Sequence, residues 1–480
     1  MSSFRGVQYT LICNDLPELW RHRFEALILE LGQSEHPEFA SYRSGGAVTY
    51  GSPEETRDFA KQTVGEITKF LKAWVPTGDW MAPSREGVGR GLSSLIGNEP
   101  ARFAEDATKF QEVDSTYIRA LIEGLAEALK KGLTFSWSPV LQLCQWVVTQ
   151  PREILGRNED QREADPHWGW TFSAISDLLS AGVETNAIPF ELRGQVWKVL
   201  EQLARGEEPT KISEGKYQKA KQSPLTISNS TERPKAIRAV IKYARWVKKQ
   251  SDKLGGEKSM RSSSALMPEV QTVLDAHLDL AVDSSLGVRS VYGETLPYLE
   301  DLDKSWLSQR ISRILPLSED QRELFDAAWN SYLVYWQPSE LFLGLLRDDY
   351  MIAIRRIPAH SQQSDSLRNP SERLAEHILI LYGWGKLQLN DPLITEFFAK
   401  VPDTVSGHGF HEIGFGLYNT KEPLSREFLE RFMALWNKRL EVARQTADKR
   451  AHIAELSAFG WWFANKELDL DWALAQWPRF

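Results

Sequence analysis

Two histidines and a glutamate come closest to a metal-ligand pattern in this sequence. They are His408, His411 and Glu412, in the segment HGFHE. Histidine nitrogens and carboxylate oxygens bind zinc, and a zinc-bound water can act as a nucleophile. However, the order His–x–x–His–Glu matches neither common zinc-protease helix, and the glycines around it argue against a rigid helix. These three residues are the candidates for an enzyme whose site is assembled from distant residues. That function is the least favoured of those the sequence allows.

A basic window at residues 211–261 stands out from an otherwise acidic chain. It holds fourteen lysines and arginines against four aspartates and glutamates, a net charge of +10. Because the whole chain carries −8, the other residues carry −18. A segment of this charge suits either the phosphates of a nucleic acid or an acidic protein surface.

One helical face collects the cations of this window. The segment RPKAIRAVIKYARWVKKQ predicts an amphipathic helix over 235–249, with an apolar stripe opposite a basic one. An acidic body attracts such a face, so pairing within the molecule is favoured, ahead of a protein partner and of nucleic acid. Nucleic-acid binding that weakens steeply with salt would reverse that order. The basic stripe consists of Lys235, Arg238, Lys242, Arg245 and Lys249.

The remaining motifs carry no recognisable reaction. The glycine-rich stretch GVGRG at 87–91 has no strand before it and no lysine after it, which favours a tight turn into a helix over a phosphate loop. His377 lies at the margin of an apolar helix face and is expected to be a satisfied interfacial histidine. The sequence contains no nucleophile elbow and no Walker A loop. We therefore expect no cofactor and no bound metal.

Eighteen tryptophans are spread from Trp20 to Trp477, nearly all within helical patterns. The densest clusters lie in DPHWGWTF at 165–172 and in ELSAFGWWFAN at 455–465. Aromatic cages for cationic ligands exist, but adjacent residues on a helix point about 100° apart and cannot form a cage alone. The spacing favours packing between helices.

Helical periodicity positions all of these residues. One clear helix begins at Ser318, which is expected to form a capping box with Gln321, and a second begins near Pro423. Strand signals are confined to VQYTLI near the N-terminus and AVTY at 47–50. Further helices are predicted near residues 53–74, 115–131, 138–149, 171–181, 190–204, 268–280, 371–382, 392–400 and 451–464.

The predicted fold class is all-α, with an irregular array of helical hairpins or a HEAT-like solenoid. Residues 1–52 form an arm of uncertain structure, 53–204 a first helical half, 205–267 a basic linker around the 235–249 helix, and 268–480 a second half. A signal peptide and a membrane-length apolar run are both missing from the sequence, and its two cysteines lie in apolar stretches. We therefore expect a cytoplasmic protein with buried thiols and no membrane contact.

Several segments together resemble the uncharacterised α-helical C-terminal regions of very large bacterial multidomain proteins. In those proteins the helical region follows an NTPase or a sirtuin-like domain, and some are associated with anti-phage defence. The resemblance spans roughly residues 50–470, although the basic window is longer and more charged here. The segments are GDWMAPSREGVGRGL (78–92), SPVLQLCQWVVTQPREI (138–154), IPFELRGQVWKVLEQL (188–203), RAVIKYARWV (238–247), VRSVYGETLPYLEDLDKSWL (288–307), FDAAWNSYLVY (325–335), SERLAEHILILYGWGKLQL (371–389) and ELSAFGWWF (455–463).

The resemblance implies a helical scaffold or sensor region and no catalytic residue. This sequence contains no NTPase or sirtuin-like module of its own, so the resemblance implies either a separately encoded enzymatic partner or a longer protein of which this chain is a terminal portion. The expected function is therefore a non-enzymatic scaffold or recognition subunit of a bacterial complex, with anti-phage defence as the setting that the resemblance implies. A nucleic-acid-binding protein that uses the basic stripe is the first alternative.

Overall fold

The structure is a computed structural model that describes residues 59–76, 83–157, 164–259, 266–358, 369–419, 424–463, 468 and 471–472. The predicted N-terminal arm, both tempting strand segments and Cys13 lie outside these residues. Within them the secondary structure is helical, and the only β-type pairing is an isolated bridge between Glu153 and His167. The all-α prediction is confirmed.

The first part of the chain forms α-helices joined by short turns. Side chains cap several of them at the N-terminus: Thr63 forms a capping box with Glu66 at α3, and Asp114 accepts the amide of Thr116 at α6. The helices are α3 (Val64–Ala73), α4 (Arg85–Ile96), α5 (Pro100–Glu105), α6 (Ser115–Lys130), α7 (Trp137–Val147), α8 (Gly169–Glu184) and α9 (Arg193–Ala204), with 3-10 turns η3 (Ala107–Phe110) and η4 (Phe190–Leu192).

The middle of the chain is more ordered than the predicted linker. The expected helix over 235–249 lies inside the longer α12 (Glu232–Ser259). The stretch 205–234, expected to be a loop, contains α10 (Lys211–Lys219) and α11 (Pro224–Ser230). Thr210 and Ser223 cap these two helices, so this polar stretch contains helix-start signals.

The second part of the chain continues the helical array. Ser318 does not form the expected capping box: residues Glu319–Gln321 form a 3-10 turn, and the helix starts after it. The helices are α13 (Pro268–Leu278), α14 (Leu286–Glu294), α15 (Leu296–Leu302), α16 (Lys304–Ile314), α17 (Arg322–Tyr335), α18 (Glu340–Leu345), α19 (Arg347–Arg356), α20 (Pro370–Gly383), α21 (Pro392–Lys400), α22 (Asp403–Asn419), α23 (Arg426–Gln445), α24 (Ile453–Ala458) and α25 (Gly460–Phe463), with 3-10 turns η5 (Glu319–Gln321) and η6 (Lys449–His452).

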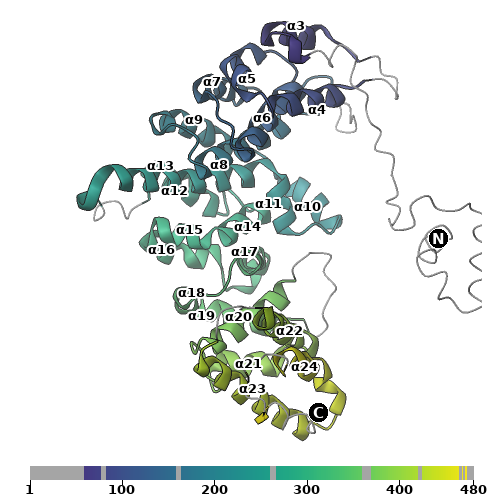
Figure 1. Cartoon of the computed structure of the whole chain (residues 1–480), viewed down its shortest axis with the longest axis vertical. Coiled ribbons are helices and arrows are strands. Elements are labelled where there is room, and N and C mark those ends of the chain that lie inside the picture. The colour runs from purple at the N-terminus through teal and green to yellow at the C-terminus, as the bar shows by residue number, and fades with distance from the viewer. Residues whose placement is uncertain are drawn as a thin grey trace, which may run out of the picture.

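These helices follow one another along the long axis of the molecule, from α3 at one end to α23 and α24 at the other (Figure 1). Along one row, α4 packs on α6, α6 on α8, α8 on α12, α12 on α14, α14 on α17, α17 on α20 and α20 on α22. One large apolar core runs through the array from Phe59 to Leu468, beside a small separate cluster of Leu286, Leu324 and Ala327. An elongated array of this kind exposes a large surface relative to its volume.

Most tryptophans belong to this core, as the helical spacing predicts. Trp436 is completely buried, and Trp329 is only 2% exposed. Among the described tryptophans, Trp170 and Trp384 are exposed, with 47% and 52% of their surface accessible. In the described part of the chain, no helix has both the length and the apolar character that crossing a membrane requires.

Candidate binding surface

The basic stripe lies along α12, where four of its five side chains meet acidic residues of neighbouring helices. On one side, the Lys235 amine lies 2.7 Å from an Asp177 carboxylate oxygen of α8. The Lys242 amine lies 2.9 Å from Glu184, also in α8. The acidic body therefore attracts this side of the stripe within the molecule.

On its other side the stripe contacts α14 and α15. Arg238 donates hydrogen bonds to both carboxylate oxygens of Glu294, at 2.8 and 2.6 Å. The Arg245 guanidinium lies 3.7 Å from the ring centre of Tyr298 and 3.8 Å from Asp301. These contacts are the intramolecular pairing that the charge pattern favoured.

Lys249 differs from the rest of the stripe because it is exposed and has no ion-pair partner among the described residues. It lines a groove of about 600 Å³ near the C-terminal end of α12. The charged side chains of this groove are Lys242, Arg245, Lys248, Lys249, Lys253, Glu184, Asp252 and Asp301. Five basic against three acidic residues give the groove a net charge of +2.

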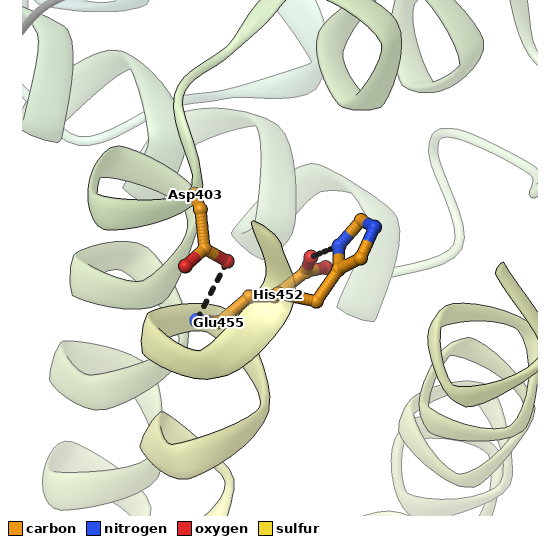
Figure 2. Close-up of side chains that lie close together, drawn as sticks. All are labelled: Asp403, His452 and Glu455. Carbon is orange, nitrogen blue, oxygen red and sulfur yellow. Dashed lines mark hydrogen bonds and ion pairs between the residues drawn. The ribbon is translucent and has the colours of Figure 1, made fainter. Parts of the chain in front are cut away.

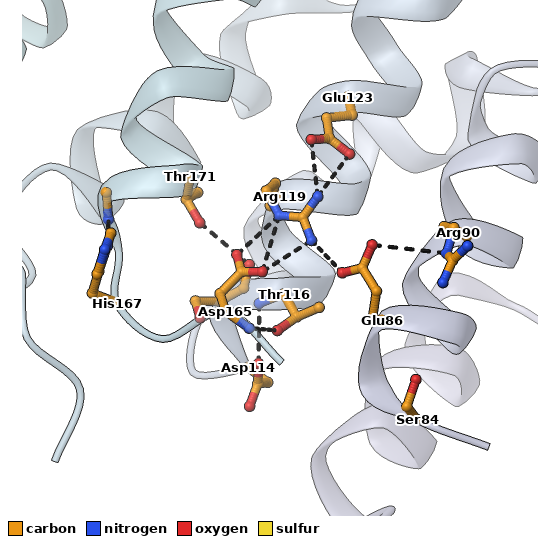
Figure 3. Close-up of polar contacts among 12 residues, drawn as sticks. Ser84, Glu86, Arg90, Asp114, Thr116, Arg119, Glu123, Asp165, His167 and Thr171 are labelled. Atoms are coloured by element: carbon orange, nitrogen blue, oxygen red, sulfur yellow. Dashed lines mark hydrogen bonds and ion pairs between the residues drawn. The ribbon is translucent and has the colours of Figure 1, made fainter. Parts of the chain in front are cut away.

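A second polar cluster, which the sequence did not suggest, surrounds Arg119 of α6 (Figure 3). Arg119 donates to both oxygens of Asp165 at 3.0 Å and to both oxygens of Glu123 at 3.0 and 3.1 Å. It also contacts Glu86, in the first turn of α4, at 2.5 Å. Asp165 is completely buried in the loop before α8, where its amide donates to the hydroxyl of Thr116. Three segments, α4, α6 and the loop before α8, thus meet at one guanidinium.

The electrostatics of this cluster follow from burial and charge. Burial raises the pKa of Asp165 to about 6, although Arg119 opposes the shift. Burial alone would lower the pKa of Arg119, but its carboxylate partners more than offset this effect and raise it. Arg119 is therefore a permanent cation held in one orientation.

Arg119 in turn holds the half-exposed ring of Trp170. Its guanidinium lies 5.5 Å from the ring centre, and the imidazole of His167 meets the indole edge-to-face at 6.4 Å. Two hollows, of about 730 and 470 Å³, both include Trp170, Ser173 and Ser230 in their walls. We call Trp170 together with these two hollows the Trp170 surface.

Sequence spacing could not reveal this cluster. Arg119 lies 33 residues from Glu86 and 46 from Asp165, and only the packing of α4, α6 and α8 brings them together. The one available signal was the segment DPHWGWTF, which contains Asp165, His167 and Trp170. The predicted packing role of its tryptophans is confirmed for Trp168, which meets Trp146, but not for the exposed Trp170.

The histidine–glutamate segment lies within α22, so the expectation that its glycines prevent a helix is wrong. His408 approaches Glu376 of α20 at 3.4 Å, and this contact raises the pKa of His408. His411 instead stacks on Phe415 and meets the edge of Trp461. The two histidines thus contact different neighbours, and the structure does not bring them together with Glu412 into one ligand set.

A different trio has metal-ligand spacing in the described part of the chain: Asp403, His452 and Glu455 (Figure 2). Its carboxylates already have partners within the protein. Asp403 accepts the amides of Ala454 and Glu455 at 2.8 and 2.9 Å and so caps α24. Glu455 forms a buried two-point ion pair with Arg439. Helix capping and ion pairing explain this cluster.

No protein-family model, curated protein or solved structure matches the chain.

Proposed function

We propose that this protein is a non-enzymatic helical scaffold or recognition subunit that binds another protein through the Trp170 surface. The setting that the sequence resemblance implies is a bacterial cytoplasmic complex with a separately encoded enzymatic subunit, in anti-phage defence. The observation that carries the proposal is a large, half-exposed indole fixed between two hollows on an elongated helical array.

The physical reasons concern preorganisation. Tryptophan is enriched at interface hot spots because its ring buries a large area while losing little conformational freedom. Here Arg119 and His167 fix the ring before any partner arrives, which lowers the entropic cost of binding. The hollows on either side offer room for partner side chains that pack against the ring. By contrast, most of the basic stripe is already paired within the protein.

The test compares two exposed tryptophans. Trp170→Ala should release a protein that co-purifies with the wild type from native host cells, because losing a hot-spot side chain costs about 2 kcal/mol or more of binding free energy. Trp384→Ala, at the C-cap of α20 and outside the Trp170 surface, should retain it. Mass spectrometry of both purifications, with matching melting temperatures, checks this expectation. Recovery of the same proteins with both variants would contradict the proposal.

Nucleic-acid binding is a second candidate, and the groove around Lys249 favours it. Lys249 and Lys253 are exposed there without partners among the described residues. In fluorescence anisotropy, the wild type should bind DNA or RNA oligonucleotides with an affinity that falls steeply as salt increases. The double variant Lys249→Glu with Lys253→Glu should abolish this binding. The matched control reverses Lys216 and Lys219 of α10, exposed cations of the same basic window. An equal loss in both variants would indicate nonspecific attraction.

A further inference from the structure

Two buried hydrogen-bond donors that have no partner among the described residues line one hollow between α17, α19 and the start of α20. Trp329 is 2% exposed, and within the described residues its indole N–H has no acceptor. The Nη1 group of Arg356, whose side chain is 15% exposed, also lacks one. Both residues line the same hollow, which has a volume of about 390 Å³. Buried polar groups are almost always hydrogen-bonded, so two orphaned donors in one hollow indicate a missing acceptor.

The walls of the hollow suit an anion. Its charged side chains are Arg322, Arg356 and Asp326, and both arginines also contact the Glu319 carboxylate, at 3.3 and 2.9 Å. Asn369 and Pro370, at the N-terminus of the fourteen-residue helix α20, also line it. The positive end of that helix dipole therefore favours negative charge at this place. The helix terminus and the orphaned donors are independent features with the same preference.

We propose that this hollow binds a carboxylate group, which accepts hydrogen bonds from the Trp329 indole and the Arg356 guanidinium. A carboxylate carries one negative charge, whereas phosphate carries nearly two and would face Asp326 and the neighbouring Glu319. A hollow of 390 Å³ has room for about a dozen water-sized groups, enough for a small organic acid or the end of a peptide. This site is separate from the Trp170 surface and does not depend on the function proposed for it.

The Trp329 indole N–H offers a direct readout. In protein labelled with ¹⁵N-tryptophan, sodium acetate should move the Trp329 indole resonance, which is assigned by its loss in Trp329→Phe. Sodium chloride at the same ionic strength should not move it, and the exposed Trp384 should respond to neither salt. An unmoved Trp329 resonance, or an equal response to chloride, would overturn the proposal.

Adjacent arginines of α19 provide the matched variants. Arg356→Gln removes the orphaned donor and should weaken acetate binding about tenfold or more, measured by calorimetry without any resonance assignment. Arg355→Gln should leave the affinity unchanged, because Arg355 is 58% exposed and pairs with Glu396. Equal acetate affinities in the two variants would exclude the assigned site.

Two further arms identify the source of the carboxylate. The first arm compares acetate with a short peptide, tested both with a free C-terminus and amidated. Tighter binding of the free peptide than of both acetate and the amidated peptide would indicate a peptide terminus. Equal affinity for acetate and the free peptide would indicate a small acid. Pro358 and Asn369 line the hollow and flank residues 359–368 in the sequence. Asp365→Asn removes the one carboxylate in the sequence of that segment. If acetate bound only to that variant, the acceptor would come from the chain itself and the external ligand would be refuted.

Discussion

His377 shows at the residue scale how burial and hydrogen bonding fix a charge state. It is completely buried on α20, where its Nε2 contacts the Trp336 carbonyl and its Nδ1 contacts the Tyr350 hydroxyl, both at 2.8 Å. A neutral imidazole that donates from Nε2 and accepts at Nδ1 satisfies both contacts. Burial lowers the pKa of His377 to about 3. The expected satisfied interfacial histidine is found, deeper in the core than its marginal position on the helix suggested.

This low pKa predicts acid sensitivity. In the unfolded chain the histidine pKa is about 6.5, so below that pH the unfolded state binds a proton that the folded state does not. The contribution of His377 to stability should therefore be complete above about pH 6.5 and should fall as the pH decreases toward 3, by about 2 kcal/mol at pH 5. Urea unfolding between pH 7 and 5 measures it. His377→Gln should show a smaller pH dependence, and an unchanged slope would contradict the assignment to His377.

Sequence spacing predicts which candidate residues lie side by side only where a single helix carries all of them. The five cations of the basic stripe share a face of α12 because their spacing is helical. Which acids they meet depends on α8, α14 and α15, and no local pattern encodes that. The Arg119 cluster and the hollow beside Trp329 combine residues from several helices, so packing alone creates them.

At the scale of the element, α22 shows why a glycine-rich segment can be a helix. Its glycines allow neighbouring helices to approach closely. A Cβ at Gly407 would lie 2.6 Å from the Ala454 carbonyl oxygen of α24, and one at Gly409 would lie 2.9 Å from Leu379 of α20. Each glycine costs about 1 kcal/mol in an isolated helix, but close packing of α22 offsets that cost. Local propensity alone therefore argues against a rigid helix in this segment.

Two glycines of this helix should respond oppositely to alanine. Gly407→Ala should destabilise the protein by about 2 kcal/mol, because neither the Ala454 backbone nor α22 can move freely. Gly416→Ala should stabilise it by about 0.5–1 kcal/mol, because no atom lies within 4 Å of the added Cβ. Chemical denaturation of both variants provides the measurement. A loss of stability in Gly416→Ala would show that helix propensity does not govern that position.

At the scale of the whole molecule, α12 connects the two parts of the array. It packs on α8 and α9 on one side and on α13, α14 and α15 on the other. Its cations alternate between these sides: Lys235 and Lys242 contact α8, while Arg238 contacts α14. The basic window of the sequence thus forms a helix whose cations join two acidic regions of the chain. The apolar core also continues through α12.

The Arg238–Glu294 pair should dominate this connection. Its side chains are 12% and 15% exposed, whereas the acids that meet Lys235 and Lys242 are at least half exposed and their pairs are worth less than about 1 kcal/mol. Arg238→Gln leaves Glu294 partly buried without its cation, which should cost about 3 kcal/mol. Because α14 then loses its polar contact with α12, hydrogen exchange should accelerate in α14 and α17 while α4 and α6 keep their protection. Lys249→Gln, on the same helix but without an ion-pair partner in the described part of the chain, should change neither quantity. Uniform acceleration along the whole array would instead show that its two parts open together, so that the apolar core rather than the ion pair sets their coupling.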